Sequence, residues 1–170
     1  AGGGDWVLFG SYDYKLRCLE AATGKEVWTV ETGNYLNGTP AFVGKTVVFA
    51  GCDALLHVVG LADGKEVQTV EVGAYVGASP AVAGSRAYVG HYENKFVAID
   101  VEAGSVLWQR GGAFPYMGSP ALAVDRVVVG AQDKKVHAYR TSDGTTLWEF
   151  RTRGEVNSSP VVCGGRVVVG

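Results

Sequence analysis

Several features that mark common protein classes are scarce or missing in this sequence of 170 residues. No window of about eighteen consecutive apolar residues occurs, so no segment is expected to span a membrane as a helix. Basic residues are scattered, with no run longer than Lys134-Lys135, and the formal net charge is only −2, which argues against a nucleic-acid partner. The opening residues AGGGDW lack the charged and apolar regions of a signal peptide, as a mature secreted chain also would. The sequence therefore leaves the compartment open.

Cysteine is also sparse. The three cysteines, Cys18, Cys52 and Cys163, are odd in number, and none belongs to a C-x-x-C pair. Such spacing predicts neither a disulfide framework nor a zinc site. We interpret all three as small apolar residues of the protein interior, where unpaired cysteine is common.

Signatures of catalysis are missing as well. The chain contains neither a G-x-S-x-G nucleophile elbow nor an H-E-x-x-H metal motif. His57 and His137 lie two 40-residue repeats apart, so they are expected on separate sheets, and His91 stands alone. A metal site needs ligands that converge, so we predict no metal site and no catalytic residues.

A sustained helical period is absent, and the abundant residues favour strands. Glycine accounts for 25 of the 170 residues and valine is frequent, a composition that favours an all-β chain. The dominant feature is internal repetition. Four units align without a gap over 1–40, 41–80, 81–120 and 121–160, and a partial fifth unit covers 161–170. We interpret 1–170 as a single domain built from these repeats.

The repeats share a few fixed positions. Each full unit closes on a proline preceded by serine or threonine, as in Ser79-Pro80. A second position, inside a turn, is always acidic: Asp13, Asp53, Glu93 and Asp133. Acidic or glycine residues suit turns because they tolerate positive φ or bond to their own backbone. A third position is tryptophan in three units, with Gln68 as the exception.

Short apolar runs inside each unit are separated by turn residues. In the fourth unit they read RVVVGA, KVHAYR and TTLWEFR, and SSPVVCG leads into the next unit. Tight turns join antiparallel neighbours, so each unit is predicted to form a four-stranded antiparallel sheet. Runs such as RVVVG are apolar throughout, which indicates a sheet covered on both faces. Such sheets, repeated every forty residues, predict the blades of a β-propeller.

The segments AIDVEAGSVLW (98–108) and AYRTSDGTTLW (138–148) resemble the tryptophan-docking motif of quinoprotein-like (PQQ-like) β-propeller repeats, and CLEAATGKEVW (18–28) is a looser copy. The resemblance covers the whole chain and implies that each motif tryptophan packs on the motif glycine of the neighbouring blade. It assigns blade docking to Trp28, Trp108 and Trp148, and the receiving turns to Gly24, Gly64, Gly104 and Gly144. Gln68 departs from this pattern, so the interface beside the second blade is expected to be weaker or filled differently.

The number of repeats raises the question of how the ring is completed. Members of this family resemble seven- or eight-bladed rings, whereas this chain holds about four blades and a quarter. An open array would expose apolar faces at both ends. The partner is therefore either the remaining blades of a longer protein or a second copy of the chain, which would close an eight-bladed homodimeric ring. A closed four-bladed monomer would need a sharper wedge between blades.

The family resemblance also raises the hypothesis of a PQQ-dependent dehydrogenase. Such enzymes hold calcium with carboxylate and amide oxygens, place an aspartate base beside the quinone, and stack the quinone on an inner tryptophan. The quinone often lies opposite a disulfide of neighbouring cysteines. This sequence has no adjacent cysteines, and its motif tryptophans occupy the docking position. We therefore predict a non-catalytic protein with no cofactor, because a fold does not confer a function.

The best candidates for function are the loops that lead into the innermost strands. They read NYLNGTP, AYVGASP, FPYMGSP and GEVNSSP in the four units, and they differ most between units. They should converge around the mouth of the propeller channel, where loops on a rigid scaffold carry binding residues. The binding candidates are Tyr35, Asn37, Tyr75, Tyr116, Met117, Glu155 and Asn157. The alternative is that these aromatic residues only fill gaps between blades.

These observations predict a scaffold for protein–protein interaction or assembly that binds a protein or peptide through the channel-mouth loops. A ligand-binding sensor propeller with its pocket at the channel mouth is the alternative. A fragment of a PQQ-dependent dehydrogenase is the least favoured hypothesis. The family resemblance alone suggests a periplasmic or extracellular location.

Overall fold

The computed structural model describes residues 2–170 of the chain. These residues form strands, turns and loops, and no helix among them is long and apolar enough to cross a membrane. The strands group into four four-stranded antiparallel sheets, which we call blades 1 to 4, and one two-stranded sheet, which we call partial blade 5. The prediction of an all-β chain of four-stranded antiparallel blades is therefore confirmed.

Each blade runs in chain order from a short inner strand to an outer strand. Blade 1 comprises β1 (Gly2–Gly3), β2 (Trp6–Gly10), β3 (Lys15–Glu20) and β4 (Glu26–Glu31). Blade 2 comprises β5 (Ala41–Val43), β6 (Thr46–Ala50), β7 (Leu55–Gly60) and β8 (Glu66–Glu71). Blade 3 comprises β9 (Ala81–Ala83), β10 (Arg86–Gly90), β11 (Lys95–Asp100) and β12 (Ser105–Gly111). Blade 4 comprises β13 (Ala121–Leu122), β14 (Arg126–Ala131), β15 (Lys135–Arg140) and β16 (Thr146–Arg151), and partial blade 5 comprises β17 (Val161–Cys163) and β18 (Arg166–Val168).

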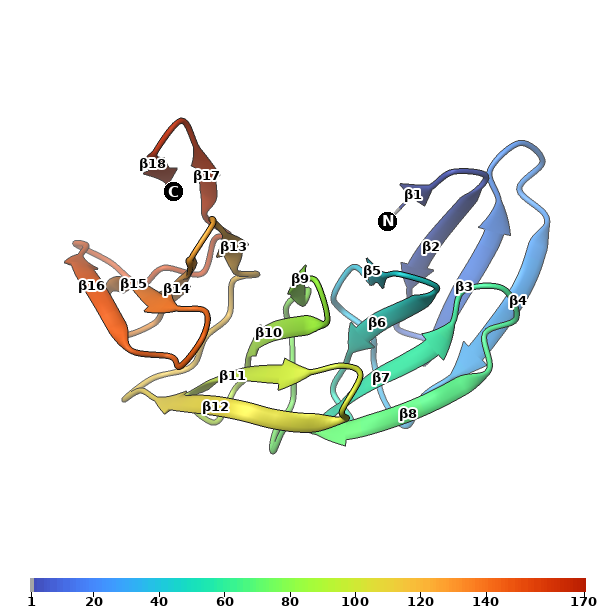
Figure 1. The fold of residues 1–170 in the computed structure, drawn as a ribbon, viewed down its shortest axis with the longest axis horizontal. Coiled ribbons are helices and arrows are strands. Elements are labelled where there is room, and N and C mark those ends of the chain that lie inside the picture. The colour runs from blue at the N-terminus through green and yellow to red at the C-terminus, as the bar shows by residue number, and fades with distance from the viewer. Residues whose placement is uncertain (1) are drawn as a thin grey trace.

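Figure 1 shows the blades side by side along an open arc. The short strands β1, β5, β9, β13 and β17 line the inner side of the arc, and β4, β8, β12 and β16 line its outer side. Consecutive inner strands from β5 to β17 contact one another. Blade 1 and partial blade 5 stand at the two ends, so each presents a face that no other blade of this chain covers.

The middle strands are apolar throughout because their two faces enter two different blade interfaces. In β10, Tyr88 packs with Val127 of blade 4, and the next residue, Val89, packs with Val76 on the side of blade 2. Both interfaces exclude water, so both sets of side chains must be apolar. This explains why runs such as RVVVG show no alternation of polar and apolar residues.

The β2–β3 turn and its equivalents contain a left-handed residue in every blade. Positive φ angles fall on Tyr14 (68°), Ala54 (66°), Asn94 (63°) and Lys134 (64°). The acidic residue before each of them has a different task, because Asp53 Oδ1 accepts the amide of Leu55 at 3.3 Å and Asp133 Oδ1 accepts that of Lys135 at 3.0 Å. Of the two roles expected for the turn acids, these aspartates therefore perform the backbone hydrogen bond.

Antiparallel blades place their connections on two opposite faces of the arc. One face carries the β2–β3 turns and the loops between blades, which are joined by bonds such as Thr32 N–H to Tyr14 O at 2.8 Å. We call this the mouth face. The other face carries the β1–β2 and β3–β4 turns, which are joined by bonds such as Leu61 N–H to Lys45 O at 2.9 Å. We call this the clasp face, because the docking tryptophans Trp28 and Trp108 donate to carbonyls of its turns, Leu61 O and Thr141 O.

A ladder of hydroxyl groups joins the blades near the inner strands. The backbone N–H of Thr39 donates to Ser79 Oγ at 2.7 Å, that of Ser79 donates to Ser119 Oγ at 2.9 Å, and that of Ser119 donates to Ser159 Oγ at 3.0 Å. Each bond spans one 40-residue repeat. Ser79, Ser119 and Ser159, each before a proline, therefore give inter-blade contacts, and the proline precedes the inner strand, where no amide donor is needed.

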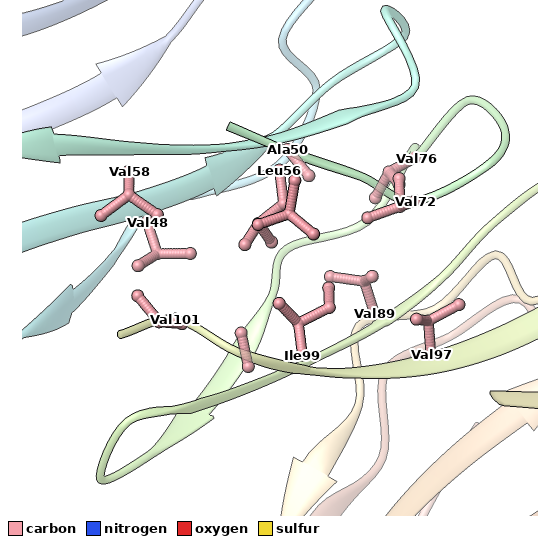
Figure 2. Close-up of a cluster of buried hydrophobic side chains, with 12 residues drawn as sticks. Val48, Ala50, Leu56, Val58, Val72, Val76, Val89, Val97, Ile99 and Val101 are labelled. Atoms are coloured by element: carbon pink, nitrogen blue, oxygen red, sulfur yellow. The ribbon is translucent and has the colours of Figure 1, made fainter. Parts of the chain in front are cut away.

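Three interfaces between complete blades form the core. The 1–2 interface mixes aliphatic residues with Trp28 and Phe49, and the 3–4 interface gathers Tyr88, Phe96, Trp108, Tyr116 and Tyr139. The 2–3 interface contains only valine, leucine, isoleucine and alanine among its buried residues. Figure 2 shows Val48, Leu56 and Val58 of blade 2 facing Val89, Ile99 and Val101 of blade 3 across that interface.

Candidate functional site

The docking tryptophans of blades 1 and 3 lie flat on glycines of the following blade. Trp28 Nε1 donates to Leu61 O at 3.0 Å, and Trp108 Nε1 donates to Thr141 O at 3.1 Å. A Cβ atom added to Gly64 would lie 2.7 Å from Trp28 Cε3, and one added to Gly144 would lie 2.6 Å from Trp108 Cε3. Only glycine permits this approach, and both receiving glycines also have positive φ.

Gln68 takes the place of the tryptophan at the 2–3 interface. Its Nε2 donates to Val101 O, the carbonyl equivalent by one repeat to Leu61 O and Thr141 O. Its Oε1 lies over Gly104, where an added Cβ atom would be 2.5 Å away. The amide thus keeps the hydrogen bond and the contact with glycine, but it lacks the area of the ring. The 2–3 interface is therefore filled differently, as expected, with Gln68 in the place of the tryptophan.

At the two ends of the arc, Gly24 and Trp148 have no docking partner of the kind that joins blades 1 and 2 within residues 2–170. Trp148 is partly buried and packs beside Val162, Val167 and Val169 of partial blade 5 and the residues that follow it. Gly24 at the other end is exposed, with no heavy atom within 4 Å of an added Cβ. The contacts of Trp28, Gln68 and Trp108 join blades to one another, and we assign these residues no chemical step.

The mouth face of blade 1 carries a cluster of exposed tyrosines. The ring of Tyr35, which is 42% exposed, meets Tyr12 edge-on at 5.2 Å and Tyr14 at 5.0 Å between ring centroids. Tyr12 is 70% exposed. The three rings therefore hold one another in place while they present a large aromatic surface to solvent.

The same loop of blade 1 is anchored to blade 2. Asn34 Nδ2 donates to Cys52 O at 3.1 Å, and Asn37 Nδ2 lies 3.7 Å from Cys52 Sγ. Burial and the neighbouring Asp53 charge raise the pKa of the Cys52 thiol, which keeps it protonated and unreactive. Asn37 itself is exposed, and its Nδ2 is directed at this anchor.

The cysteines differ in exposure, in contrast with the expectation that all three are buried. Cys18 is buried in the 1–2 interface, Cys52 is half-buried, and Cys163 is exposed on partial blade 5. The expectation was therefore wrong for Cys163. Its strand lies at the open end of the arc, where no further blade of this chain covers it.

Tyr75 of the second mouth loop is 56% exposed and borders a small cavity. The cavity has a volume of about 290 Å³ and is lined by Ala54, Gly73, Ala74, Tyr75, Tyr92 and Glu93. The ring of Tyr92 lies against Gly77, where an added Cβ atom would be 3.0 Å from Cε2. Two exposed tyrosines and one exposed carboxylate thus surround a cavity of side-chain size at the mouth of blades 2 and 3.

The third mouth loop differs from what the sequence suggested, because Tyr116 points inward. Tyr116 is only 1% exposed, and its hydroxyl lies 2.9 Å from the hydroxyl of Tyr139. Burial raises the pKa of both hydroxyls, so both stay neutral. A direct surface contact is therefore wrong for Tyr116, which fills the 3–4 interface. Met117 is half-buried, and Phe114 is the exposed aromatic residue of this loop at 51%.

The fourth mouth loop is polar. Glu155 and Asn157 are exposed, and Asn157 Oδ1 accepts a hydrogen bond from Gln132 Nε2 at 3.0 Å. Lys134 and Arg153 are also exposed there. The mouth face therefore changes from aromatic over blade 1 to charged over blade 4.

Sequence reasoning missed Tyr12, Tyr14 and Tyr92. They lie in the β2–β3 turns and not in the loops between blades, but the two kinds of segment meet on one face, as Tyr92 N–H to Tyr75 O at 3.0 Å shows. The sequence did contain a signal for them, because turns are mostly polar and these turns carry aromatic residues.

Two of the three histidines, His57 and His137, form pairs with the turn aspartates. His57 Nε2 lies 2.8 Å from Asp53 Oδ2, and His137 Nε2 lies 3.0 Å from Asp133 Oδ2. Burial, the largest single influence, raises the pKa of Asp53, but the hydrogen bond and charge of His57 together with backbone hydrogen bonds outweigh it, so the pKa lies below the ordinary 3.8. No group of three or more histidine, cysteine, aspartate or glutamate residues converges as a metal site within residues 2–170.

A calcium–quinone site does not fit these residues. A hard cation needs several converging oxygen ligands, and residues 2–170 offer no such acidic cluster. The three cysteines are unpaired, and the rings of Trp28 and Trp108 are occupied in blade docking. We derive no catalytic step through such a group.

Comparison with known families gives one match. A family of PQQ repeats described as outer membrane protein assembly factor BamB matches residues 12–119 and 114–170 of this chain. The two matched ranges together span more than half of the chain. No curated protein sequence matches closely enough to count as a relative.

Solved structures of similar fold include one natural protein and one designed protein. The crystal structure of BamB from Moraxella catarrhalis superposes with a TM-score of 0.85 at 18% identity, over 96% of this chain and 55% of that protein. The computationally designed Ika8 protein superposes with a TM-score of 0.89 at 18% identity, over 100% of this chain and 54% of that protein. The chain spans about half the length of each, and at this identity the likeness shows the fold alone.

Proposed function

The chain belongs to the PQQ-repeat family described as outer membrane protein assembly factor BamB, and from that premise we propose that it is a non-catalytic scaffold for protein interaction or assembly. The partner is a protein or peptide that binds across the mouth face. Its contacts are Tyr35, Asn37 and Tyr75 at the aromatic end, and Met117, Glu155 and Asn157 toward the charged end. Tyr116 supports this surface from below.

The observation that carries this proposal is the ordered aromatic surface of the mouth face. Tyr12, Tyr14 and Tyr35 pack edge to face on blade 1, and Tyr75 and Tyr92 border the cavity of about 290 Å³. Tyrosine is enriched among the residues that carry binding energy, because it buries a large area at little cost in conformational entropy. Rings held by their neighbours on a rigid blade lower that cost further.

A peptide selection tests this proposal. Random peptides displayed on phage are selected on the full chain, and the selected peptides are then measured against variants by fluorescence anisotropy. The double variant Tyr35→Ala/Tyr75→Ala should bind them at least tenfold more weakly, because each lost ring of this kind costs about 1–2 kcal/mol. Its melting temperature should stay unchanged, since both rings are about half exposed.

The matched control is Val124→Ala, which removes an exposed apolar side chain in the β13–β14 turn on the clasp face. This variant should bind the selected peptides as the original chain does. Selected peptides that bind the double tyrosine variant with undiminished affinity would exclude the mouth face as the site.

The two ends of the arc support a proposal about further blades. Exposed Gly24 at one end and partly buried Trp148 at the other are the open halves of the contact that joins blades 1 and 2. A cavity of about 650 Å³ beside Trp148, Phe150 and Val167–Val169 also lies open at the second end. We propose that these faces receive either the blades of a longer chain or a second copy. Light scattering separates the two, because a dimer mass for this chain supports the second copy and a monomer mass excludes it.

We also propose a periplasmic or extracellular location. The support is the family description, which names a factor of outer membrane protein assembly. The exposed Cys163 has no disulfide partner among the described residues, so it does not bear on the redox state of the compartment.

A further inference from the structure

The 2–3 interface is short of side-chain volume at three equivalent positions. Gln68 stands where blades 1 and 3 carry Trp28 and Trp108. Thr46 stands where they carry Trp6 and Arg86, and Val48 stands where they carry Leu8 and Tyr88. At one neighbouring position the side chain is larger, since Val58 stands in place of Cys18 or Ala98. This replaces only a small part of the missing side-chain volume.

A cavity lies where this volume is missing. It opens on the clasp face between blades 2 and 3, has a volume of about 580 Å³, and includes Gln68 in its lining. The related cavity between blades 3 and 4 has about 360 Å³, and Tyr88 lines it. The cavity next to Gln68 is therefore the larger of the two, as the smaller side chains require.

Valines from both blades form the walls of the cavity. Val43, Val58 and Val67 come from blade 2, and Val101 comes from blade 3. Val58 and Val101 are buried and mark one end of the aliphatic cluster in Figure 2, so the cavity continues the core outward to the surface. Two facing sheets leave a slot, and a slot with apolar walls favours a flat ring.

The rim of the cavity carries one charge of each sign. Lys45 lies in the β5–β6 turn of blade 2, and Glu102 lies in the β11–β12 turn of blade 3. Within residues 2–170, neither forms an ion pair. Gln68 Nε2 is engaged with Val101 O, and no hydrogen bond to its Oε1 occurs in the described part of the chain. The cavity thus offers a cation, an anion and a neutral acceptor around an apolar slot.

We propose that this cavity binds a free aromatic amino acid. The ring enters the valine-lined slot at the interface where the neighbouring interfaces hold a tryptophan of the protein itself. The carboxylate of the ligand lies toward Lys45 and its ammonium group toward Glu102. A ring N–H or O–H donates to Gln68 Oε1. Neither charge alone defines the ligand, but both together with the slot select a zwitterion that carries a ring.

The site is separate from the mouth face. The cavity opens among the β5–β6, β9–β10 and β11–β12 turns, whereas the partner surface lies on the loops between blades and the β2–β3 turns at the opposite ends of the strands. Loss of peptide binding in the tyrosine variants would therefore leave this proposal unaffected. Because the ligand contacts both blades, its occupancy would also tie blade 2 to blade 3.

Saturation-transfer difference NMR with L-tryptophan as the probe tests the proposal on the full chain. Ring protons of L-tryptophan should receive saturation from the protein, with a Kd on the order of 1 mM, as expected for so small a ligand in an open site. L-Alanine, which lacks the ring, should give no signal. Tryptamine and indole-3-propionate, which each lack one charge, should bind about two- to fivefold more weakly.

The decisive variant is Gln68→Trp, which fills the slot with the side chain used at the two neighbouring interfaces. It should abolish the L-tryptophan signal, while circular dichroism and gel filtration stay unchanged. Lys45→Gln and Glu102→Gln should each weaken binding about two- to fivefold. Lys25→Gln is the matched control, because Lys25 lies in a turn of the clasp face on blade 1, away from the cavity.

Three results would overturn the proposal. The first is the absence of any signal from L-tryptophan at about ten times the expected Kd. The second is an equal signal from the Gln68→Trp variant, which would place any binding elsewhere on the molecule. The third is an equally strong signal from L-leucine, which would show that the slot does not select a ring.

Discussion

The 2–3 and 3–4 interfaces share one backbone geometry but differ in their side chains. At the 3–4 interface, Trp108 and Tyr88 both donate to Thr141 O, and Arg110 Nη2 donates to Asp143 O at 2.9 Å. At the 2–3 interface, Gln68 alone bonds to the equivalent carbonyl, and the buried core beside it is aliphatic. The positions of the acceptor carbonyl and the receiving glycine are therefore fixed by the repeat, while the donor is replaceable.

This difference suggests that the two blade interfaces have different roles. An interface with aromatic rings and several hydrogen bonds stabilises the arc, whereas one with a small amide docks two blades and leaves an accessible cavity of about 580 Å³. Sites for binding often coincide with positions where local rules of packing are relaxed. Gln68 holds the docking position of the repeat and also lines the cavity.

The largest effect is expected from removal of the ring at the 3–4 interface. Trp108→Ala should lower the free energy of unfolding by about 3–5 kcal/mol, because it deletes a buried ring and leaves a cavity. Gln68→Ala should cost only about 1 kcal/mol, the net value of a hydrogen bond. Urea denaturation followed by circular dichroism measures both. Leu107→Ala is the control, since Leu107 is 41% exposed beside Trp108. Similar losses for Trp108→Ala and Gln68→Ala would show that the two interfaces are energetically alike.

A smaller effect is expected from the buried hydroxyl pair, which within residues 2–170 only the 3–4 interface contains. Tyr116→Phe or Tyr139→Phe alone should cost about 1–3 kcal/mol, because each leaves the other hydroxyl buried without its partner. The double variant should cost less than the two single losses added together, since both polar groups are then gone. A double-mutant cycle from urea denaturation gives the coupling energy. A coupling near zero would mean that the hydroxyl pair does not distinguish this interface.

The smallest effect is a dependence of stability on pH. It compares the 1–2 interface, where His57 stacks on Phe49, with the aliphatic 2–3 interface. Burial raises the pKa of Asp53, but the hydrogen bond and charge of His57, with backbone hydrogen bonds, together lower it below its ordinary value. A lowered carboxyl pKa contributes stability above the ordinary value of 3.8, and this contribution is lost as the pH falls through the folded-state pKa. Asp53→Asn should therefore destabilise the chain by about 1 kcal/mol at pH 7, and by progressively less as the pH falls below about 4.

Thermal unfolding between pH 7 and pH 3 measures this difference. Glu93→Gln is the matched control, because Glu93 holds the equivalent turn position in blade 3, where Val97 stands in place of His57. The control should show no pH-dependent difference from the original chain. A deficit of Asp53→Asn that stays constant over this range would contradict the assigned role of the carboxylate.

The sequence was sufficient to predict the blades because the signal recurs four times in register. One apolar run such as RVVVGA is ambiguous. Its order with the turns and runs that follow, which read QDK, KVHAYR and TSDG in the fourth unit, recurs at equivalent positions in all four repeats and so predicts the same strands each time. The tryptophan pattern likewise predicted the contacts of Trp28 and Trp108 through a family resemblance. The left-handed conformation of Tyr14 and Lys134 was not predictable, since neither residue type favours it.

The candidate site was predicted less well, for a reason that Tyr35 and Tyr116 illustrate. Both are tyrosines of the mouth loops, yet Tyr35 points outward to Tyr12 and Tyr14 while Tyr116 points inward to Tyr139. The two stand one residue apart in the aligned loops, and the more inward position is buried in every blade. The alternation of inward and outward residues within an irregular loop has no fixed period in the sequence.

By itself, the sequence determined the strands and the positions of the docking residues Trp28 and Trp108, because these depend on local pattern and on the register of forty residues. Only the tertiary structure decided what each position does. It showed that turns far apart in sequence meet on one face, that Gln68 keeps the hydrogen bond of the missing tryptophan, and that the lost volume opens as a cavity. The volume of a cavity and the exposure of a side chain depend on the residues of two neighbouring blades, so the sequence of one repeat does not determine them.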